Sequence, residues 1–305
     1  MNEAHIKQLA HDIGINLCGV TDKLRYPEVE EAIDVWVGKN FIPQRYGKFP
    51  HEKKKFSRLD EKYPWARSII ACAMSYNEDN EVEVNGPYGE IAKYTQRNYY
   101  AYLRNLMETL GAKIQEESGK NYRFNIYTCY NNLPEKAIAV ATGIVSYAKN
   151  GTVMEKQFGS YTILGEIITD LPIELENKTP MKNLCGSCRI CIEACPTGAL
   201  HEEYKVNIPR CYQFISENET EIIEPDKWGK KFYGCTICLD VCPITKRSQQ
   251  VTTNATTGVV GNKIELARFF DMNEENFKEY FKDNQISMRT HKAILKNAEL
   301  CKKSF

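Results

Sequence analysis

The chain has 305 residues, of which 42% are hydrophobic and 26% are charged, a composition typical of a globular protein with one large domain or two moderate ones. Lysine and arginine number 40, as do aspartate and glutamate, and this zero net charge argues against tight, unspecific binding to nucleic acid. The N-terminus lacks the pattern of a secretory signal, and no run of about eighteen apolar residues occurs. We therefore expect a cytoplasmic protein that has no contact with a membrane.

The N-terminal half of the chain alternates between helical and extended patterns. Apolar residues on one helical face precede Gly14, and residues 15–20 then look extended. Residues 26–65 are rich in Pro, Lys and aromatic residues and have no clear period. Residues 68–76 predict a buried strand, and residues 97–118 predict an amphipathic helix.

The same alternation continues before the cysteine-rich part of the chain. Alternating residues at 122–126 predict a half-buried strand. Pro134 and Glu135 suit the start of a helix, because proline is tolerated in the first turn and a carboxylate is stabilised at the positive helix end. Residues 162–168 form an apolar stretch. We expect an α+β chain that begins with a mixed α/β domain at residues 1–175.

The twelve cysteines are unevenly distributed. Eight lie between Cys185 and Cys242, and the others are scattered at Cys18, Cys72, Cys129 and Cys301. Disulfides are rare in the reducing cytoplasm, so clustered cysteines there indicate metal binding. The scattered cysteines are more typical of buried apolar residues than of ligands.

The first cysteine motif is a C-x2-C-x2-C-x3-C-P run that ends at Pro196. Three cysteines at this spacing on a tight loop can reach three corners of a cubane iron–sulfur cluster, while the cysteine before the proline ligates the neighbouring cluster. The small residues Gly186 and Ser187 let backbone N–H groups approach the sulfides. The run is therefore typical of bacterial ferredoxins.

The second motif, residues 235–243, keeps two loop cysteines and a cysteine–proline pair. Two cubanes need eight thiolates, and Cys211 is the only further cysteine in this region. The ferredoxin pattern then assigns one [4Fe–4S] cluster to Cys185, Cys188, Cys191 and Cys242, and the other to Cys195, Cys211, Cys235 and Cys238. Since each cluster takes a ligand from the opposite motif, the two clusters must lie close together.

Structural zinc is the alternative, because zinc also binds C-x2-C pairs. Zinc does not explain a third cysteine at the same spacing or the two cysteine–proline pairs. We therefore predict a ferredoxin-like two-cluster module at residues 176–248, with one-electron redox chemistry.

The remainder, residues 249–305, is predicted to be a linker followed by helices that pack back on the core. Residues 249–261 are polar and Thr-rich, as is typical of a linker or surface loop. Helical patterns follow at residues 264–270, 274–281 and 292–300.

Residues 185–200, 210–211 and 233–243 resemble the cluster module of epoxyqueuosine reductases, a cobalamin-dependent family related to the reductive dehalogenases. The resemblance covers nearly the whole chain, and its most telling part is the Gly-Ser…Leu-Gly-Glu segment between Phe158 and Ile167. Further segments that are similar to the family lie at residues 66–70, 91–94, 135–137, 149–150, 169–172 and 277–298.

This resemblance implies an oxidoreductase with a cobalamin between the α/β domain and the cluster module. Electrons would pass from a low-potential donor, such as ferredoxin or flavodoxin, through both clusters to the cobalamin, and a small-molecule or nucleoside-type substrate would be reduced. The residues that we place near the cobalamin are Lys149, Asn150, Ser160 and Tyr161. The chain has no Asp-x-His-x-x-Gly run, so no protein histidine is expected to replace the lower cobalt ligand.

Two departures from the family limit what the resemblance implies. Cys129 stands where the family has its proton-donating aspartate; its thiol or the adjacent Tyr130 hydroxyl could donate a proton, or the site has lost that chemistry. The alternative function is then a two-cluster electron carrier or reductive activator without its own corrinoid. The chain also stops where the family's tRNA-contacting helical repeats would begin, which argues against a tRNA substrate.

Overall fold

The computed structural model describes residues 1–43, 49–129, 133–220 and 222–305. Its central sheet has four strands in the order β1-β2-β7-β4, and neighbouring strands are antiparallel. These strands are β1 (Leu17–Thr21), β2 (Ser68–Ser75), β7 (Thr162–Thr169) and β4 (Phe124–Thr128). All eight residues of β2 are buried, because this central strand is covered on both faces.

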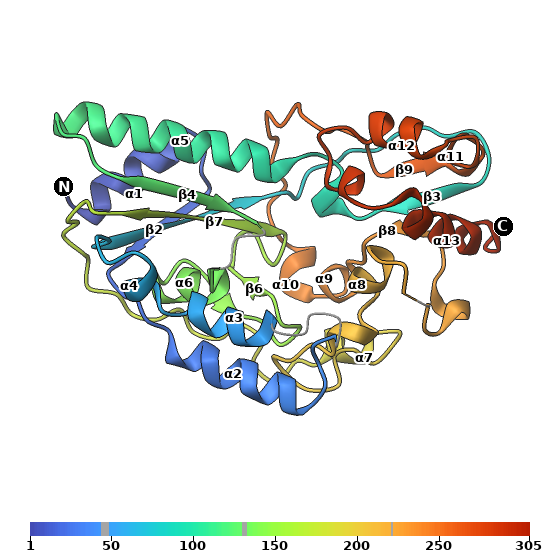
Figure 1. Cartoon of the computed structure of the whole chain (residues 1–305), viewed down its shortest axis with the longest axis horizontal. Coiled ribbons are helices and arrows are strands. Elements are labelled where there is room, and N and C mark those ends of the chain that lie inside the picture. Colours follow the sequence, from blue (N-terminus) through green and yellow to red (C-terminus); the bar gives the residue numbers. More distant parts are fainter. Residues whose placement is uncertain (44–48, 130–132, 221) are drawn as a thin grey trace.

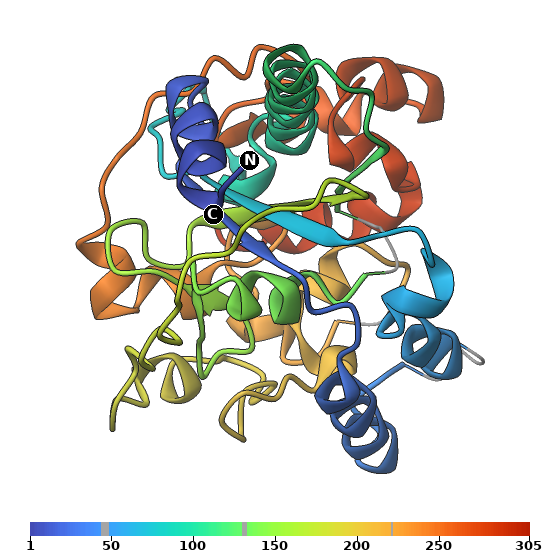
Figure 2. The same cartoon turned by 90° about the vertical axis from the view of Figure 1, so that its left-hand side faces the viewer.

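Two helices cover one face of this sheet, α1 (Glu3–Asp12) and α5 (Tyr99–Ser118) (Figures 1 and 2). Apolar residues of both helices pack against β2 and β7 in one cluster. The Asn98 side chain caps α5 by accepting from the backbone N–H of Ala101, and Gly119 ends the helix with a left-handed φ of 63°. This pair of helices fixes the back of the sheet.

The opposite face carries shorter helices, which are α2 (Pro27–Gly38), α3 (Phe49–Phe56), α4 (Leu59–Lys62) and α6 (Glu135–Ala141). The apolar face of α6 packs on the sheet in a second cluster with Leu59 and Tyr63. In contrast, α2 buries no residue completely. It is held by an ion pair in which Arg58 donates to Glu30 over 2.8 Å.

The cysteine-rich segment lies beneath this face and at one end of the sheet (Figure 1). Its helices are short because its loops return repeatedly to place thiols: α7 (Ile190–Glu193), η3 (Ile208–Arg210), α8 (Tyr212–Ser216), η4 (Pro225–Lys227), α9 (Ile237–Asp240) and α10 (Pro243–Lys246). A small hairpin of β5 (Ser146–Tyr147) and β6 (Val153–Met154) precedes it.

A second sheet joins three distant parts of the chain. Its order is β8-β3-β9, with β3 (Tyr88–Ile91), β8 (Lys231–Tyr233) and β9 (Lys263–Glu265). Phe232, Phe269, Phe277 and Phe281 pack beneath it. The remaining elements are η2 (Lys93–Thr95), α11 (Leu266–Phe270), α12 (Glu274–Tyr280), η5 (Gln285–Met288) and α13 (His291–Lys302).

The mixed α/β architecture matches the prediction, as do the long strands and α5. The helical pattern at residues 264–270 is only partly correct, because its first residues form β9 and only the later ones form α11. The helices α2 and α3 lie in the segment without a clear period. No helix among the described residues is long and apolar enough to cross a membrane.

Candidate iron–sulfur and cofactor site

The cysteines of the first motif form one group with the distant Cys242. Burial raises the pKa of the Cys185 thiol, and the nearby thiols of Cys242 and Cys188 add to the rise. Burial also raises the pKa of the Cys191 thiol, to which the other three members of the group contribute. Ionisable groups shift one another in this way only at short range, so these four thiols lie within electrostatic range of one another.

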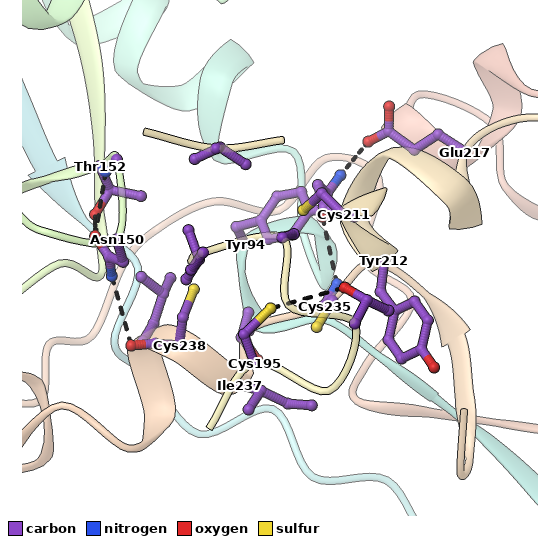
Figure 3. Close-up of a pocket in the computed structure, with 18 of the residues that line it drawn as sticks. Tyr94, Asn150, Thr152, Cys195, Cys211, Tyr212, Glu217, Cys235, Ile237 and Cys238 are labelled. Carbon is purple, nitrogen blue, oxygen red and sulfur yellow. Dashed lines mark hydrogen bonds between the residues drawn. The ribbon is translucent and has the colours of Figure 1, made fainter. Parts of the chain in front are cut away.

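A second group contains Cys195, Cys211, Cys235 and Cys238. Burial raises the pKa of the Cys235 thiol to about 11, with Cys211 and Cys195 adding to the rise. Burial likewise raises the pKa of the Cys238 thiol well above its usual value, and the same neighbours contribute. Figure 3 shows the side chains of this group around one common space.

The structure places members of each predicted set within electrostatic range of one another, although no three His, Cys, Asp or Glu side chains of the described chain are arranged to hold a single metal ion. Each set takes one cysteine from the opposite motif, Cys242 in the first set and Cys195 in the second. Four crowded thiolates repel one another unless a cation lies between them, and a cubane iron–sulfur cluster supplies that positive charge. The chemistry of each donor set therefore fits a [4Fe–4S] cluster.

Backbone N–H groups reach both sets. The N–H of Lys149 donates to Sγ of Cys185 over 3.5 Å. The N–H groups of Gln213 and Phe214 bond to the Cys211 thiol and offset part of the pKa rise that burial causes. Hydrogen bonds to the sulfurs are one means by which a protein tunes a cluster's potential.

The two sets differ in their surroundings. The loop of the first set is exposed at Gly186, Ser187 and Arg189, and Ile190 is 43% exposed. All four cysteines of the second set line a cavity of about 450 Å³, whereas the four of the first set, all within the described chain, are not part of its lining. The first set therefore faces solvent and the second faces an internal space.

This smaller cavity lies between the α/β sheet and the second cysteine set. Tyr76, Tyr94, Tyr100 and Cys129 contribute to its wall from the sheet side. Gln285 of η5 also lines it, and the buried Oε1 of this residue has no hydrogen-bond donor in the described chain. A buried acceptor of this kind is costly unless a bound group donates to it.

A larger cavity of about 760 Å³ adjoins the first. Trp36, Phe56 and Tyr147 give it an aromatic wall, and Lys136 and Gly151 line both cavities. Lys136 is exposed at the cavities, and its Nζ donates to the carbonyl of Gly151 over 2.5 Å. Burial lowers the pKa of this ammonium group.

The predicted cobalamin contacts divide into two groups. Asn150 lines the smaller cavity, where its Nδ2 donates to the carbonyl of Cys238 over 3.5 Å (Figure 3). Lys149, Ser160 and Tyr161 are not among the residues that line either cavity in the described chain. The Nζ of Lys149 instead pairs with Glu203 at 3.0 Å.

The segment around Ser160 docks the α/β domain on the cysteine-rich segment. The Ser160 N–H donates to Oγ1 of Thr245 over 3.1 Å, and the Tyr161 hydroxyl donates to Asp240 over 2.5 Å. Gly159 has a φ of +61°, and a Cβ built on it would lie 2.6 Å from Cα of Thr245. Glycine is required here by both its backbone conformation and this close approach.

Cys129 lies at the cavity wall with an unusual backbone. Its φ is 48°, a left-handed conformation that costs energy for a residue other than glycine and that often occurs at functional sites. Burial raises the pKa of the Tyr100 phenol well above its usual value, and among the neighbouring groups Cys129 adds most to the rise. Tyr130, the other predicted proton donor, lies outside the described residues.

Several cavity residues were not predicted from the sequence. Tyr76, Tyr94 and Tyr100 belong to a strand end, a 3₁₀ turn and a helix, where aromatic residues usually only fill a core. Lys136 and Tyr94 do lie in segments that resemble the family, and this was the one signal that could have identified them.

Two family models match the chain. Residues 184–245 match the model described as "4Fe-4S double cluster binding domain", and residues 57–128 match "Epoxyqueuosine reductase QueG, DUF1730". The fold and the two thiol sets thus define a two-cluster iron–sulfur oxidoreductase.

Comparison with curated relatives identifies the family of oxidoreductases to which the chain belongs. An epoxyqueuosine reductase of Synechocystis sp. is 32% identical over 203 residues, which are 65% of this chain and 69% of the relative. That of Cyclobacterium marinum is 25% identical over 97% of this chain and 96% of its own length. The chain belongs to the epoxyqueuosine reductase family.

Solved structures of the same family have the same fold as this chain. A selenomethionine-labelled epoxyqueuosine reductase superposes with a TM-score of 0.88 at 25% identity, over 99% of this chain and 81% of that one. The enzyme from Streptococcus thermophilus gives 0.86 at 26% identity, over 98% of this chain and 80% of that one.

Proposed function

We propose that this protein is a cobalamin-dependent reductase in which electrons pass through two [4Fe–4S] clusters to a cofactor in the two adjoining cavities. The observation that carries the proposal is the position of the second cysteine set, since all four of its thiols face the smaller cavity. The exposed first set would accept electrons from the donor, and the second set would deliver them.

The cavities suit a large cofactor. Binding sites for small molecules and cofactors usually measure about 300–1,000 Å³ and are mostly apolar, and here volumes of about 450 and 760 Å³ adjoin at Lys136 and Gly151. Asn150, Lys136 and the unsatisfied Oε1 of Gln285 would hold the amide-rich edge of a corrinoid. A bound cobalamin would supply a strongly reducing centre, and the protein's part is placement, exclusion of water and proton delivery.

We assign proton donation to Cys129. Cys129 lines the smaller cavity and contacts Tyr100, and a thiol can act as a general acid. A structure of the Bacillus subtilis relative shows a catalytic loop, named for its aspartate, swung out of the active site, so a loop residue supplies catalytic chemistry in that enzyme. By the family resemblance, Cys129 takes that aspartate's place here.

The substrate that we propose is an epoxide in a modified nucleoside of tRNA. One relative has been crystallised with an epoxyqueuosine-modified tRNA stem loop. From the sequence, the missing helical repeats argued against a tRNA substrate. The C. marinum relative weakens that argument, because this chain spans 96% of that epoxyqueuosine reductase.

The test is turnover under anaerobic conditions. Cluster-loaded protein with cobalamin, reduced flavodoxin and an epoxyqueuosine-containing stem loop should yield queuosine by mass spectrometry. Cys235→Ser, in the second set, should abolish the product, and Cys18→Ser, outside both sets, should retain it. Loaded protein that binds cobalamin but forms no product would contradict the proposed substrate.

An electron carrier without a corrinoid is the second candidate, and the missing aspartate favours it. A carrier would exchange electrons with flavodoxin at full rate without cobalamin. Tight retention of cobalamin would exclude this function.

A further inference from the structure

A carboxyl group lies inside the central sheet and has no hydrogen-bond partner for its side chain among the described residues. Glu166 is on β7, paired with Ala71 of β2 on one side and Tyr127 of β4 on the other. The residue is 0% exposed, and neither of its side-chain oxygens has a partner in the described chain. A buried carboxylate in this position would lose its hydration and gain no donor.

A second carboxyl group, that of Glu135, lies within electrostatic range of Glu166. Burial raises the pKa of Glu166 well above 4.5, and the charge of Glu135 at the start of α6 adds to the rise. Cys72 and Tyr26 also lie within electrostatic range of Glu166. Both have raised pKa values, Cys72 chiefly through a hydrogen bond with Cys18 and Tyr26 chiefly through burial. Without a cation among these neighbours, burial favours the protonated form of Glu166.

Further ionisable groups lie within electrostatic range of this buried acid or in the lining of the two cavities. Glu135 lines the larger cavity, beside Lys136. Tyr100 lies within electrostatic range of both Glu135 and Cys129, and Tyr100 and Cys129 line the smaller cavity. Glu135 is thus within electrostatic range both of the buried Glu166 and of Tyr100 at the wall that carries Cys129.

We propose that Glu166 and Glu135 form a two-carboxyl proton store that resupplies the proton donor of the reduction. This inference rests on the proposed function. Removal of an epoxide oxygen consumes two electrons and two protons and releases water. The electrons arrive through the clusters, Cys129 gives one proton to the departing oxygen, and water in the cavity gives the other. The Cys129 thiolate then takes a proton from the carboxyl pair, which regains it from water, so the cycle balances.

Infrared spectroscopy tests the store without any turnover. Wild-type protein should show at neutral pH the carbonyl stretching band of a protonated, unhydrated carboxylic acid. Glu166→Gln should lose the band, and Glu135→Gln should keep it, since Glu166 remains buried. The matched control is Glu3→Gln: Glu3 is also 0% exposed, but it pairs with Lys178 and Lys7 and its pKa is lowered, so its removal should not change the band.

Absence of the band from wild-type protein would overturn the proposal, and this outcome does not depend on whether Glu166→Gln folds. The same conclusion would follow from a band that persists in a folded Glu166→Gln variant.

Kinetics tests whether the store serves the reaction. In multiple-turnover assays, Glu166→Gln should slow steady-state product formation roughly 10- to 100-fold at alkaline pH, while the rate of cluster reduction and the rate of the first turnover stay unchanged. The wild-type rate should persist to higher pH than that of the variant. Identical pH profiles would refute the role in resupply, whereas absence of product from wild-type protein would instead refute the proposed function.

Discussion

Cys238 and Cys191 belong to different sets of thiols, yet they lie within electrostatic range of each other. Burial and the other thiols of its own set raise the pKa of Cys238, and Cys191 adds to that rise. The two sets of thiols are therefore close neighbours, as the proposed electron path from the exposed set to the cavity requires.

The first prediction concerns Cys211, the ligand that lies outside both motifs. In reduced wild-type protein the two clusters should interact magnetically in the electron paramagnetic resonance spectrum. Cys211→Ser should lower the iron content towards half and abolish the interaction, because the second cluster loses a ligand. The control Cys301→Ala removes a buried cysteine outside both sets, and it should keep the wild-type spectrum. Full iron content in Cys211→Ser would exclude Cys211 as a ligand.

The second prediction follows from the unequal exposure of the two sets. Ile190 and its neighbours leave the first set open to solvent, whereas the second is enclosed. Brief exposure to oxygen should therefore destroy the first cluster before the second. Mössbauer spectra at intermediate times should show one intact cluster and no magnetic interaction; simultaneous loss of both would contradict this order.

A third prediction concerns the cavity wall. Cys129→Ala should slow product formation by about 100-fold, as expected on losing a general acid, while cobalamin binding is retained. Cys129→Asp should restore much of the rate, because aspartate tolerates a left-handed φ and carries a proton-donating group. Cys18→Ala serves as the control. An unchanged rate in Cys129→Ala would show that the thiol is not the donor.

The fourth prediction is a pH dependence of stability near the second cysteine set. Burial lowers the pKa of Lys296 from 10.5 to about 8, although its Nζ donates to the carbonyl of Ile215 over 2.7 Å. Between these two pH values the unfolded chain binds more protons than the folded chain, so stability rises with pH across this window. The gain should be on the order of 1–2 kcal/mol after screening.

The measurement is the midpoint of thermal unfolding of anaerobic protein from pH 7.5 to 10. Lys296→Met cannot titrate, so the difference between wild type and this variant should change across the window in favour of wild type. A constant difference would mean that Lys296 has an ordinary pKa.

The sequence predicted the parts of the fold that depend on local pattern. The apolar run of β7 and the 3.6-residue period of α5 were sufficient, and the cysteine spacing predicted the double-cluster domain that the family model matches at residues 184–245. The strands β3, β8 and β9 were missed, because each has three or four residues and is stabilised by pairing with a distant segment. For the same reason no local pattern predicts the cavities, whose walls come from three parts of the chain.

Single residues also divide into those that a local pattern could have identified and those that depend on contacts between distant segments. Glu166 is the one charged residue within the apolar β7, a signal that could have marked it before the structure was known. Ser160 and Tyr161 were placed beside the cofactor on the family resemblance, whereas their hydrogen bonds in the structure are to Thr245 and Asp240. Only the packing of one segment on another distinguishes docking residues from cofactor ligands.

The most direct test of the proposed chemistry is metal analysis of protein expressed without oxygen and supplied with cobalamin. The account predicts iron and sulfide for two cubanes and one tightly held cobalamin per chain, with no histidine coordination in the cobalt spectrum, since no histidine of the described chain lines either cavity. Full iron content with no retained cobalt would contradict the account.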